Sequence, residues 1–228
     1  MLILAPPGKP VSSFPDPRRE GTGDVVAWGA NLHPETLRRA YRMGIFPWPH
    51  ANMPLPWFCP DPRAVLEFDR LHIPESLEKA RRKSSFTITI DTAFAEVIAA
   101  CATVPRNGQD GTWITPVIQR AYCRLHQRGE AHSVEVWDAD GHLVGGLYGV
   151  DAGGLFTGES MFHRASNTSK LALLHLIEHL SARGADFIDI QQLTPHMARL
   201  GAHEIPRPEF LDRLAAAQQQ NRRLFHKE

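Results

Sequence analysis

The sequence predicts an α+β protein with a small, loop-rich N-terminal domain (residues 1–62) and a larger layered domain (residues 63–228). The first observation behind this is the distribution of proline, which removes a backbone donor from helices and sheets: 12 of the 18 prolines fall within the first 62 residues. The second is that stretches with helical periodicity and stretches with period-two patterning alternate after residue 63. Mixed strands with helices between them are typical of α+β and α/β layer folds.

The composition is that of an ordinary globular protein. Its 25 basic and 25 acidic residues sum to zero, which argues against binding a polyanion through bulk charge, and a hydrophobic content of 43% argues against disorder. Cys59, Cys101 and Cys123 lie far apart without a CxxC pair, which is typical of a reducing compartment. No apolar run approaches about 18 residues and the first residues lack a signal-peptide pattern, so we expect a cytoplasmic protein without a membrane span.

The N-terminal domain is expected to hold one helix. Pro34 opens it as a first-turn proline, Gly44 closes it, and Leu37 and Tyr41 form an i,i+4 pair between them. Prolines recur from residue 54 to residue 62, and their fixed φ and missing N–H predict that this run is neither a regular helix nor a central strand.

The larger domain is expected to begin with a helix over about 74–83 and a strand over 86–90. Asp91 is expected to cap a helix that runs to about residue 101, and Thr115 a second helix that ends at Gly129. The Asp140-Gly141 turn predicts a hairpin of strands 132–137 and 143–150. A short strand (154–157), a long helix (about 167–183), a strand (187–190), a short helix and a final helix (about 207–219) follow.

Two basic clusters stand out against the neutral total. Lys79, Arg81, Arg82 and Lys83 end the helix expected after residue 74. On the helix after Thr115, the side chains of Arg120, Arg124 and Arg128 share the face opposite Ile118, Ala121, Tyr122 and Leu125. Either cluster is a solvated helix face or a contact for nucleic-acid phosphates, which favour such rows of arginine and lysine.

Three short motifs offer other chemistries. His175-Leu-Ile-Glu-His179 matches H-x-x-E-H, a zinc peptidase pattern, but it lies on a helix that is apolar nearly all round and has no obvious third ligand. Gly158-Glu-Ser-Met-Phe162 is like a nucleophile elbow, yet phenylalanine stands where glycine is required, which favours a structural role for Ser160. Gly108-Gln-Asp-Gly111 lacks the Lys-Ser/Thr of a phosphate loop.

An ordered set of segments carries a resemblance to a known family. They are Gly44-Ile-Phe-Pro-Trp48, Trp57-Phe-Cys-Pro-Asp-Pro-Arg-Ala64, Gly111-Thr-Trp-Ile-Thr115, His132-Ser-Val-Glu-Val136, Val144-Gly-Gly-Leu-Tyr-Gly149, Leu155-Phe-Thr-Gly-Glu-Ser-Met-Phe162, Asp189-Ile-Gln191 and Leu200-Gly-Ala202. Together they resemble the bacterial leucyl/phenylalanyl-tRNA–protein transferase over about residues 24–210.

The resemblance implies a fold and a reaction. The fold would be a small N-terminal domain joined to a GNAT-like acyltransferase domain. The reaction would move leucine or phenylalanine from Leu-tRNA or Phe-tRNA to proteins that begin with arginine or lysine, marking them for degradation by the N-degron pathway. We expect a monomer without metal or cofactor. The alternatives are a coenzyme A-dependent acyltransferase, although the pyrophosphate loop of that class is missing, and a zinc peptidase using His175, Glu178 and His179.

The chemistry of an aminoacyl ester indicates what the site must supply. The ester is already activated, so the enzyme has to hold its carbonyl and the attacking amine in line. A peptide amine with a pKa of about 7.7–8.0 is partly neutral at pH 7. By resemblance, Gln191 would accept a hydrogen bond from this amine and Asp189, two residues away on a strand, would orient Gln191. A neutral amide is too weak a base to take the proton, so any relay would end on Asp189, water or the ribose leaving group.

The resemblance also implies an apolar pocket for the donor side chain. The matching positions are Trp48, Trp113, Tyr122, Leu147, Phe156, Met161, Leu176, Leu180 and Ile188, with Glu159 a candidate partner for the donor's amino group or terminal adenosine. Without the resemblance, alternation and helix face would assign most of the apolar positions to the hydrophobic core. Leu147, Leu176 and Leu180 depart from the methionine and phenylalanines of the family pattern, and we expect this to change the preference between leucine and phenylalanine. The basic clusters would contact the tRNA.

Overall fold

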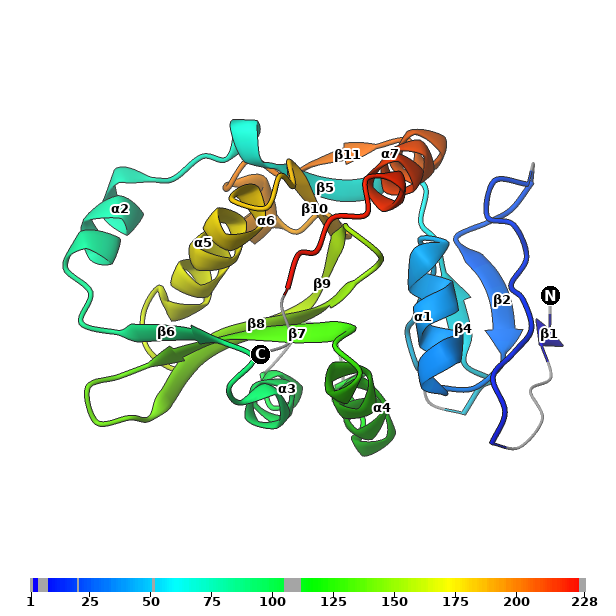
Figure 1. Ribbon diagram of the computed structural model, residues 1–228, viewed down its shortest axis with the longest axis horizontal. Coiled ribbons are helices and arrows are strands. Elements are labelled where there is room, and N and C mark those ends of the chain that lie inside the picture. The colour runs from blue at the N-terminus through cyan, green and yellow to red at the C-terminus, as the bar shows by residue number, and fades with distance from the viewer. Residues whose placement is uncertain (1, 4–7, 20, 51, 105–111, 226–228) are drawn as a thin grey trace.

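The computed structural model describes residues 2–3, 8–19, 21–50, 52–104 and 112–225, and within these ranges the strands form two sheets (Figure 1). The smaller sheet has the order β1-β2-β4-β3 and is built from Leu2–Ile3, Val25–Gly29, Pro56–Phe58 and Phe46–Pro47. The larger sheet has the order β11-β5-β10-β9-β8-β7-β6. The α+β class is therefore confirmed.

The larger sheet is antiparallel except where β9 and β10 run side by side. Its strands are β5 (Arg63–Glu67), β6 (Thr87–Ile90), β7 (Ala131–Trp137), β8 (Leu143–Asp151), β9 (Phe156–His163), β10 (Phe187–Gln191) and β11 (His203–Ile205). The β9–β10 pair is parallel, with Thr157 opposite Asp189. This pair lies in the interior of the sheet, so the polar residues on it are placed between two layers of helices.

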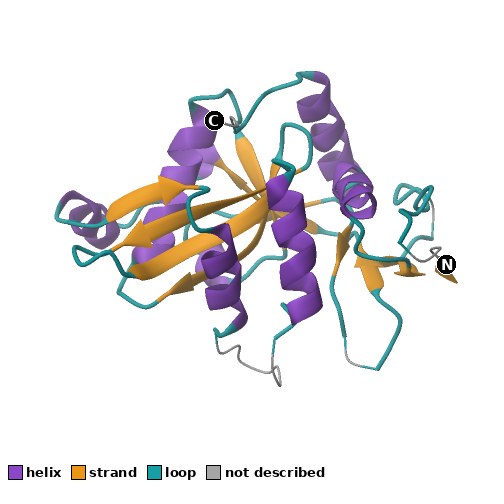
Figure 2. Ribbon diagram, turned by 60° about the horizontal axis from the view of Figure 1, so that its bottom comes forward, coloured by secondary structure: helices purple, strands orange, loops and turns teal. Residues whose placement is uncertain are grey.

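Helices cover both faces of this sheet (Figures 1 and 2). One face packs against α5 (Thr168–Ser181), and the other against α3 (Phe94–Ala102) and α4 (Pro116–Gln127), which gives two apolar cores. α2 (Glu75–Arg82) is peripheral and buries only Leu77. The other helices are α1 (Pro34–Arg42), the 3₁₀ helix η1 (Phe68–Arg70), α6 (Pro195–Ala198) and α7 (Arg207–Gln219). Within the described segments, no helix is long and apolar enough to cross a membrane.

The exclusion of a central strand from residues 54–62 is wrong. β4 lies inside the smaller sheet, with β2 and β3 on either side. Pro56 is the first of its three residues, so the missing N–H falls at the strand end, and its carbonyl still accepts from the backbone N–H of Trp48 at 3.2 Å. The domain expected to be loop-rich thus contains a sheet beside its one helix.

Two other local expectations need correction. Asp91 does not cap α3, which begins after Ala93 without a side-chain cap. Its carboxylate accepts instead from the backbone N–H of Ser133 at 2.9 Å. The strand expected at 154–157 is β9, which begins at Phe156 and runs to His163, and the sequence pattern does not predict β5 or β11. The Thr115 cap is confirmed: its hydroxyl accepts from the N–H of Ile118 at 3.4 Å.

Candidate functional site

Two β-bulges meet where β9 and β10 run parallel. In the β8–β9 ladder, Tyr148 faces Ser160 and Gly149 faces Gly158, which leaves Glu159 as the extra residue. In the β10–β5 ladder, the register shifts between Asp189 and Gln191. Bulges re-aim side chains and are common next to active sites. Here they turn Glu159 and Gln191 toward each other.

Asp189 is fully buried, and four donors surround its carboxylate. Oδ1 accepts from Nε of Arg63 at 2.8 Å and from the backbone N–H of Gln191 at 2.9 Å. Oδ2 accepts from Nη2 of Arg63 at 2.7 Å and from the hydroxyl of Thr157 at 3.0 Å. Asp189 therefore orients Gln191 through the backbone N–H of the bulge. The side-chain amide of Gln191 bonds to Glu159 instead.

Arg63 joins three parts of the chain. Beyond its bidentate pair with Asp189, its Nη1 donates to the carbonyl of Gly44 at 3.1 Å. The guanidinium lies between the rings of Phe46 and Phe210, 4.9 and 4.5 Å from their centroids. Only 1% of the side chain is exposed. This buried cation therefore connects β10 to the segment that leads into β3 and to α7.

Gln191 presents its amide toward Glu159. Its φ of +65° is in the left-handed region, which is uncommon for a residue with a side chain. Nε2 donates to Oε1 of Glu159 at 2.7 Å. With Nε2 engaged, the amide oxygen is the atom available to accept a hydrogen bond from a substrate.

Glu159 is held by two tyrosines from the helices on either side. Tyr41 on α1 donates to Oε1 at 2.8 Å, and the hydroxyl of Tyr122 on α4 lies 3.4 Å from Oε2. The two hydroxyls also bond to each other, so the single proton of Tyr122 goes either to Tyr41 or to Oε2. Burial raises the pKa of Glu159 to about 7, although the hydrogen bonds from Tyr41 and Gln191 act in the opposite direction. Burial and the charge of Glu159 raise the pKa of both tyrosines, which therefore act as neutral donors.

Two pockets meet at Glu159. The first, here called the apolar pocket, measures about 210 Å³ and lies between β8, β9, β10 and α5. The second, the tryptophan pocket, measures about 230 Å³ and is lined on one side by Phe46, Pro47, Trp48 and Trp113. Glu159, Ile190, Gln192 and Thr194 line both, and Gln191 lines the second.

The structure brings most of the predicted substrate residues together. The apolar pocket is lined by Leu147, Phe156, Glu159, Met161, Leu176 and Ile188, and the tryptophan pocket by Trp48 and Trp113. Tyr122 does not line either pocket but bonds to Glu159. Leu180 is the exception: it lies further along α5, fully buried among core side chains, and lines neither pocket. The structure does not bring Leu180 to the pocket wall, because α5 reaches the pocket only with an earlier turn.

Sequence reasoning missed several residues of this site. The sequence pattern places Tyr41 only in an i,i+4 pair with Leu37, and Arg63 only within the segment from Trp57 to Ala64 that resembles the family. A lone arginine directly before Ala64, Val65 and Leu66, all buried, is the signal that could have identified a buried ion pair. His196 and Met197 on α6 also line the apolar pocket, and nothing in their short segment distinguishes them.

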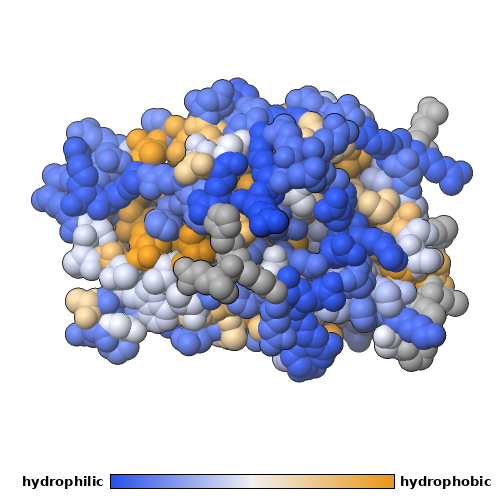
Figure 3. Space-filling model, in the orientation of Figure 1, coloured by the Kyte–Doolittle hydropathy of each residue, from blue (hydrophilic) through white to orange (hydrophobic). Residues whose placement is uncertain are grey.

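The basic clusters are partly neutralised by carboxylates. Arg81 pairs with Glu178 on α5, and Arg128 pairs with Glu35 on α1. Lys79, Arg82 and Lys83 remain exposed at the end of α2, where the surface is strongly hydrophilic (Figure 3), as do Arg120 and Arg124 on α4. Exposure leaves these five side chains accessible to phosphates.

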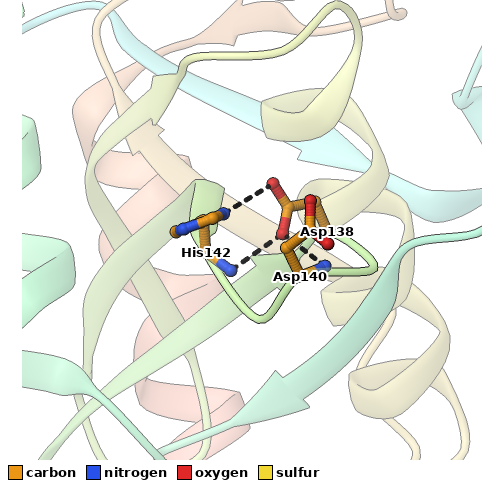
Figure 4. Close-up of side chains that lie close together, drawn as sticks. All are labelled: Asp138, Asp140 and His142. Carbon is orange, nitrogen blue, oxygen red and sulfur yellow. Dashed lines mark hydrogen bonds and ion pairs between the residues drawn. The ribbon is translucent and has the colours of Figure 1, made fainter.

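The H-x-x-E-H residues engage separate partners. Nε2 of His179 bonds to the carbonyl of Leu224 at 2.8 Å, and Glu178 is paired with Arg81. Among the described residues, the one group whose ligand atoms could hold a metal ion is Asp138, Asp140 and His142, at the tip of the β7–β8 hairpin (Figure 4). The Asp138 carboxylate there accepts from the backbone N–H groups of Asp140 and His142 at 3.0 and 2.8 Å, and bonds of this kind stabilise a turn. The Gly108–Gly111 segment lies outside the described residues.

Comparison with known proteins identifies the family. Residues 65–215 match the family model described as leucyl/phenylalanyl-tRNA protein transferase, and residues 30–61 match that of its N-terminal domain. A leucyl/phenylalanyl-tRNA–protein transferase of Desulfatibacillum aliphaticivorans is 51% identical over 88% of this chain and 86% of its own. Those of Nitratidesulfovibrio vulgaris (strain DP4) and Chromohalobacter salexigens are 49% and 54% identical, over 92% and 86% of this chain and 90% and 75% of their own.

The likeness to solved structures is much weaker. The structure of L-PGS from Bacillus licheniformis aligns with 59% of this chain and 48% of its own at 11% identity and a TM-score of 0.42, which is too distant to bear on the site. The family assignment comes from the sequence matches, which extend over nearly the whole chain and include both pockets. The chain belongs to the leucyl/phenylalanyl-tRNA protein transferase family.

Proposed function

We propose that this chain transfers leucine or phenylalanine from its charged tRNA to the α-amino group of proteins that begin with arginine or lysine, marking them for the N-degron pathway. The observation that carries the proposal is the meeting of the two pockets at Glu159 and Gln191. One pocket is apolar, as a leucyl or phenylalanyl side chain requires, and the other has aromatic walls on which an adenine ring can stack.

The donor ester would lie where the pockets meet. With the side chain in the apolar pocket and the terminal adenosine between Trp48 and Trp113, the ester carbonyl falls beside Gln191. The amide oxygen of Gln191 then accepts a hydrogen bond from the attacking amine, while Asp189 holds the bulge that positions Gln191. Such positioning can account for most of the catalysis, since the ester is already activated.

The wider setting is also proposed. The chain divides near residue 62 into the N-terminal domain and a GNAT-like domain, a division supported by the separate sheets on either side. The tRNA would contact the basic ends of α2 and α4. Three free cysteines support a cytoplasmic setting, and we propose that the chain acts there as a monomer. Family membership favours charged tRNA over coenzyme A as donor.

The test uses tRNA carrying labelled leucine and two otherwise identical acceptor proteins, one starting with arginine and one with alanine. Label on the arginine protein alone supports both the reaction and the acceptor class. Label on neither protein refutes the proposed reaction, and equal label on both refutes the acceptor class. Repeating the assay with labelled phenylalanine measures the donor preference.

A further inference from the structure

Glu159 is the one carboxylate among the described residues that line the two pockets. It lines both, so it lies where donor and acceptor would meet. Oε1 already accepts from Tyr41 and Gln191, whereas among the described residues Oε2 has at most one donor, the hydroxyl of Tyr122 at 3.4 Å. Oε2 therefore retains the capacity to accept a further hydrogen bond from a bound substrate.

Asp189 cannot take a proton from the substrate as it stands. A carboxylate has about four lone-pair sites, and Asp189 uses them for two bonds from Arg63, one from Thr157 and one from the Gln191 backbone. The residue is also fully buried and lines neither pocket. It is a positioning residue.

Gln191 can orient the amine but cannot hold its proton, because a neutral amide is a very weak base. Its Nε2 donates to Oε1 of Glu159 and the residue lines the tryptophan pocket, so its oxygen is the atom that can accept from the amine. Because Gln191 and Glu159 line the same pocket, we infer that an amine bound to that oxygen can donate a second hydrogen bond to the Glu159 carboxylate. The carboxylate is thus the basic group that the geometry offers to the attacking nitrogen.

We propose that Glu159 is a catalytic residue that carries the proton from the acceptor amine to the ribose oxygen of the departing tRNA. This inference rests on the proposed function. As the nitrogen forms its bond to the ester carbon, Glu159 takes the N–H proton. When the C–O bond to the ribose breaks, the oxygen keeps the electron pair and receives that proton. The carboxylate returns to its starting state, and no other reactant is needed.

The surroundings of Glu159 suit this role. A pKa of about 7 lets the group both accept and release a proton near neutral pH. The titratable and charged groups around it are Tyr41 from α1, Tyr122 from α4, Arg63 from β5 and Asp189 from β10, with His196 from α6 in the same pocket. Because the carboxylate form is the active one, transfer through Glu159 is lost as the pH falls through about 7.

The test compares Glu159→Gln, which keeps the shape and two hydrogen-bonding atoms, with Glu159→Ala assayed with and without formate. Glu204→Gln serves as the control for loss of a charge, since Glu204 is exposed on β11 and lines neither pocket. We measure kcat and KM for charged tRNA across pH. Proton transfer to a positioned side chain contributes roughly 100- to 10,000-fold, so kcat of Glu159→Gln should fall by at least about 100-fold.

Each outcome bears on the proposal. Support requires that kcat falls with little change in KM, that the acid limb near pH 7 disappears, and that formate restores part of the activity of Glu159→Ala. A kcat within a few-fold of the wild type, an unchanged acid limb, or no rescue by formate overturns it. Failure of the wild-type protein to transfer label at all would instead refute the proposed function.

Discussion

Removing the Arg63 guanidinium should leave the Asp189 carboxylate buried without its countercharge. Arg63→Met keeps an apolar stem between Phe46 and Phe210 but deletes both bonds to Asp189 and the bond to the Gly44 carbonyl. Breaking a buried pair by removing one partner costs about 3–5 kcal/mol. The lost bond to a backbone carbonyl adds about 1 kcal/mol, so we expect a loss of about 4–6 kcal/mol in the free energy of unfolding.

Urea unfolding followed by circular dichroism measures this loss. With a slope of about 2 kcal/mol per molar urea, the midpoint should fall by roughly 2–3 M. The control is Arg18→Met, which breaks the pair with Asp212. Because 41% and 75% of these side chains are exposed, this substitution should cost only about 0–1 kcal/mol.

A second variant separates the buried charge from loss of packing. The double variant Arg63→Met with Asp189→Leu has no unpaired buried charge, so this variant should be more stable than Arg63→Met alone. A loss below about 1 kcal/mol for the single variant would show that water reaches Asp189 and would refute the buried-pair argument. A double variant no more stable than the single one would attribute the loss to packing.

Three further predictions concern the pockets and the tRNA surface. Tyr41→Phe removes a hydrogen bond that favours the ionised form of Glu159, so the pKa of Glu159 should rise and the acid limb of transfer should move to higher pH; an unchanged limb contradicts this. Leu180→Ala should lower the free energy of unfolding, measured in urea, by about 2–5 kcal/mol and leave the ratio of leucine to phenylalanine transfer unchanged. Leu176→Ala should instead move that ratio toward phenylalanine. Arg82→Glu should raise KM for charged tRNA and reduce the slope of log affinity against log salt by about 1, while an unaltered slope would assign this side chain to a solvated surface.

The helices of the larger domain could be predicted from the sequence because their signals are local. Thr115 and Pro116 mark the start of α4, and the apolar face from Ile118 to Leu125 follows the helical period. α5 was equally clear, since its buried positions extend nearly all round the helix. Caps and periodicity depend on neighbours within one or two turns, and such signals survive in any tertiary context.

The strands were harder because their pairing is decided by distant segments. β9 was cut short at 157 because glycine, glutamate and serine at 158–160 do not alternate in hydrophobicity. In the structure these residues form the bulge, which interrupts the period-two pattern. β4 was excluded because proline is rare inside sheets, yet a three-residue strand that starts with Pro56 loses only a terminal donor. Both errors arise where a sheet departs from its regular repeat.

The residues of the candidate site were also only partly predictable, because several of them meet through contacts between distant parts of the chain. The resemblance to the family implies Asp189, Gln191 and the pocket residues, most of which the structure brings together, but it also implies Leu180, which lines neither pocket, and it gives Arg63 and Tyr41 no role. A pattern along the chain cannot show that Arg63 reaches Asp189, which is 126 positions away. It also cannot show that Tyr41 meets Glu159 across the junction of the two sheets.

These long-range contacts imply that the two proposed domains form one functional unit. The boundary falls directly before Arg63, whose side chain bonds back to Gly44 and forward to Asp189. The first bond fixes the start of the segment that carries Phe46 and Trp48 into the tryptophan pocket, and the second fixes the strand that carries Gln191 into the same pocket. One buried guanidinium thus sets the spacing between the pocket's two walls. Any shift of the small sheet against the large one must therefore change the distance between the aromatic wall and Gln191, and with it the alignment of ester and amine on which the reaction depends.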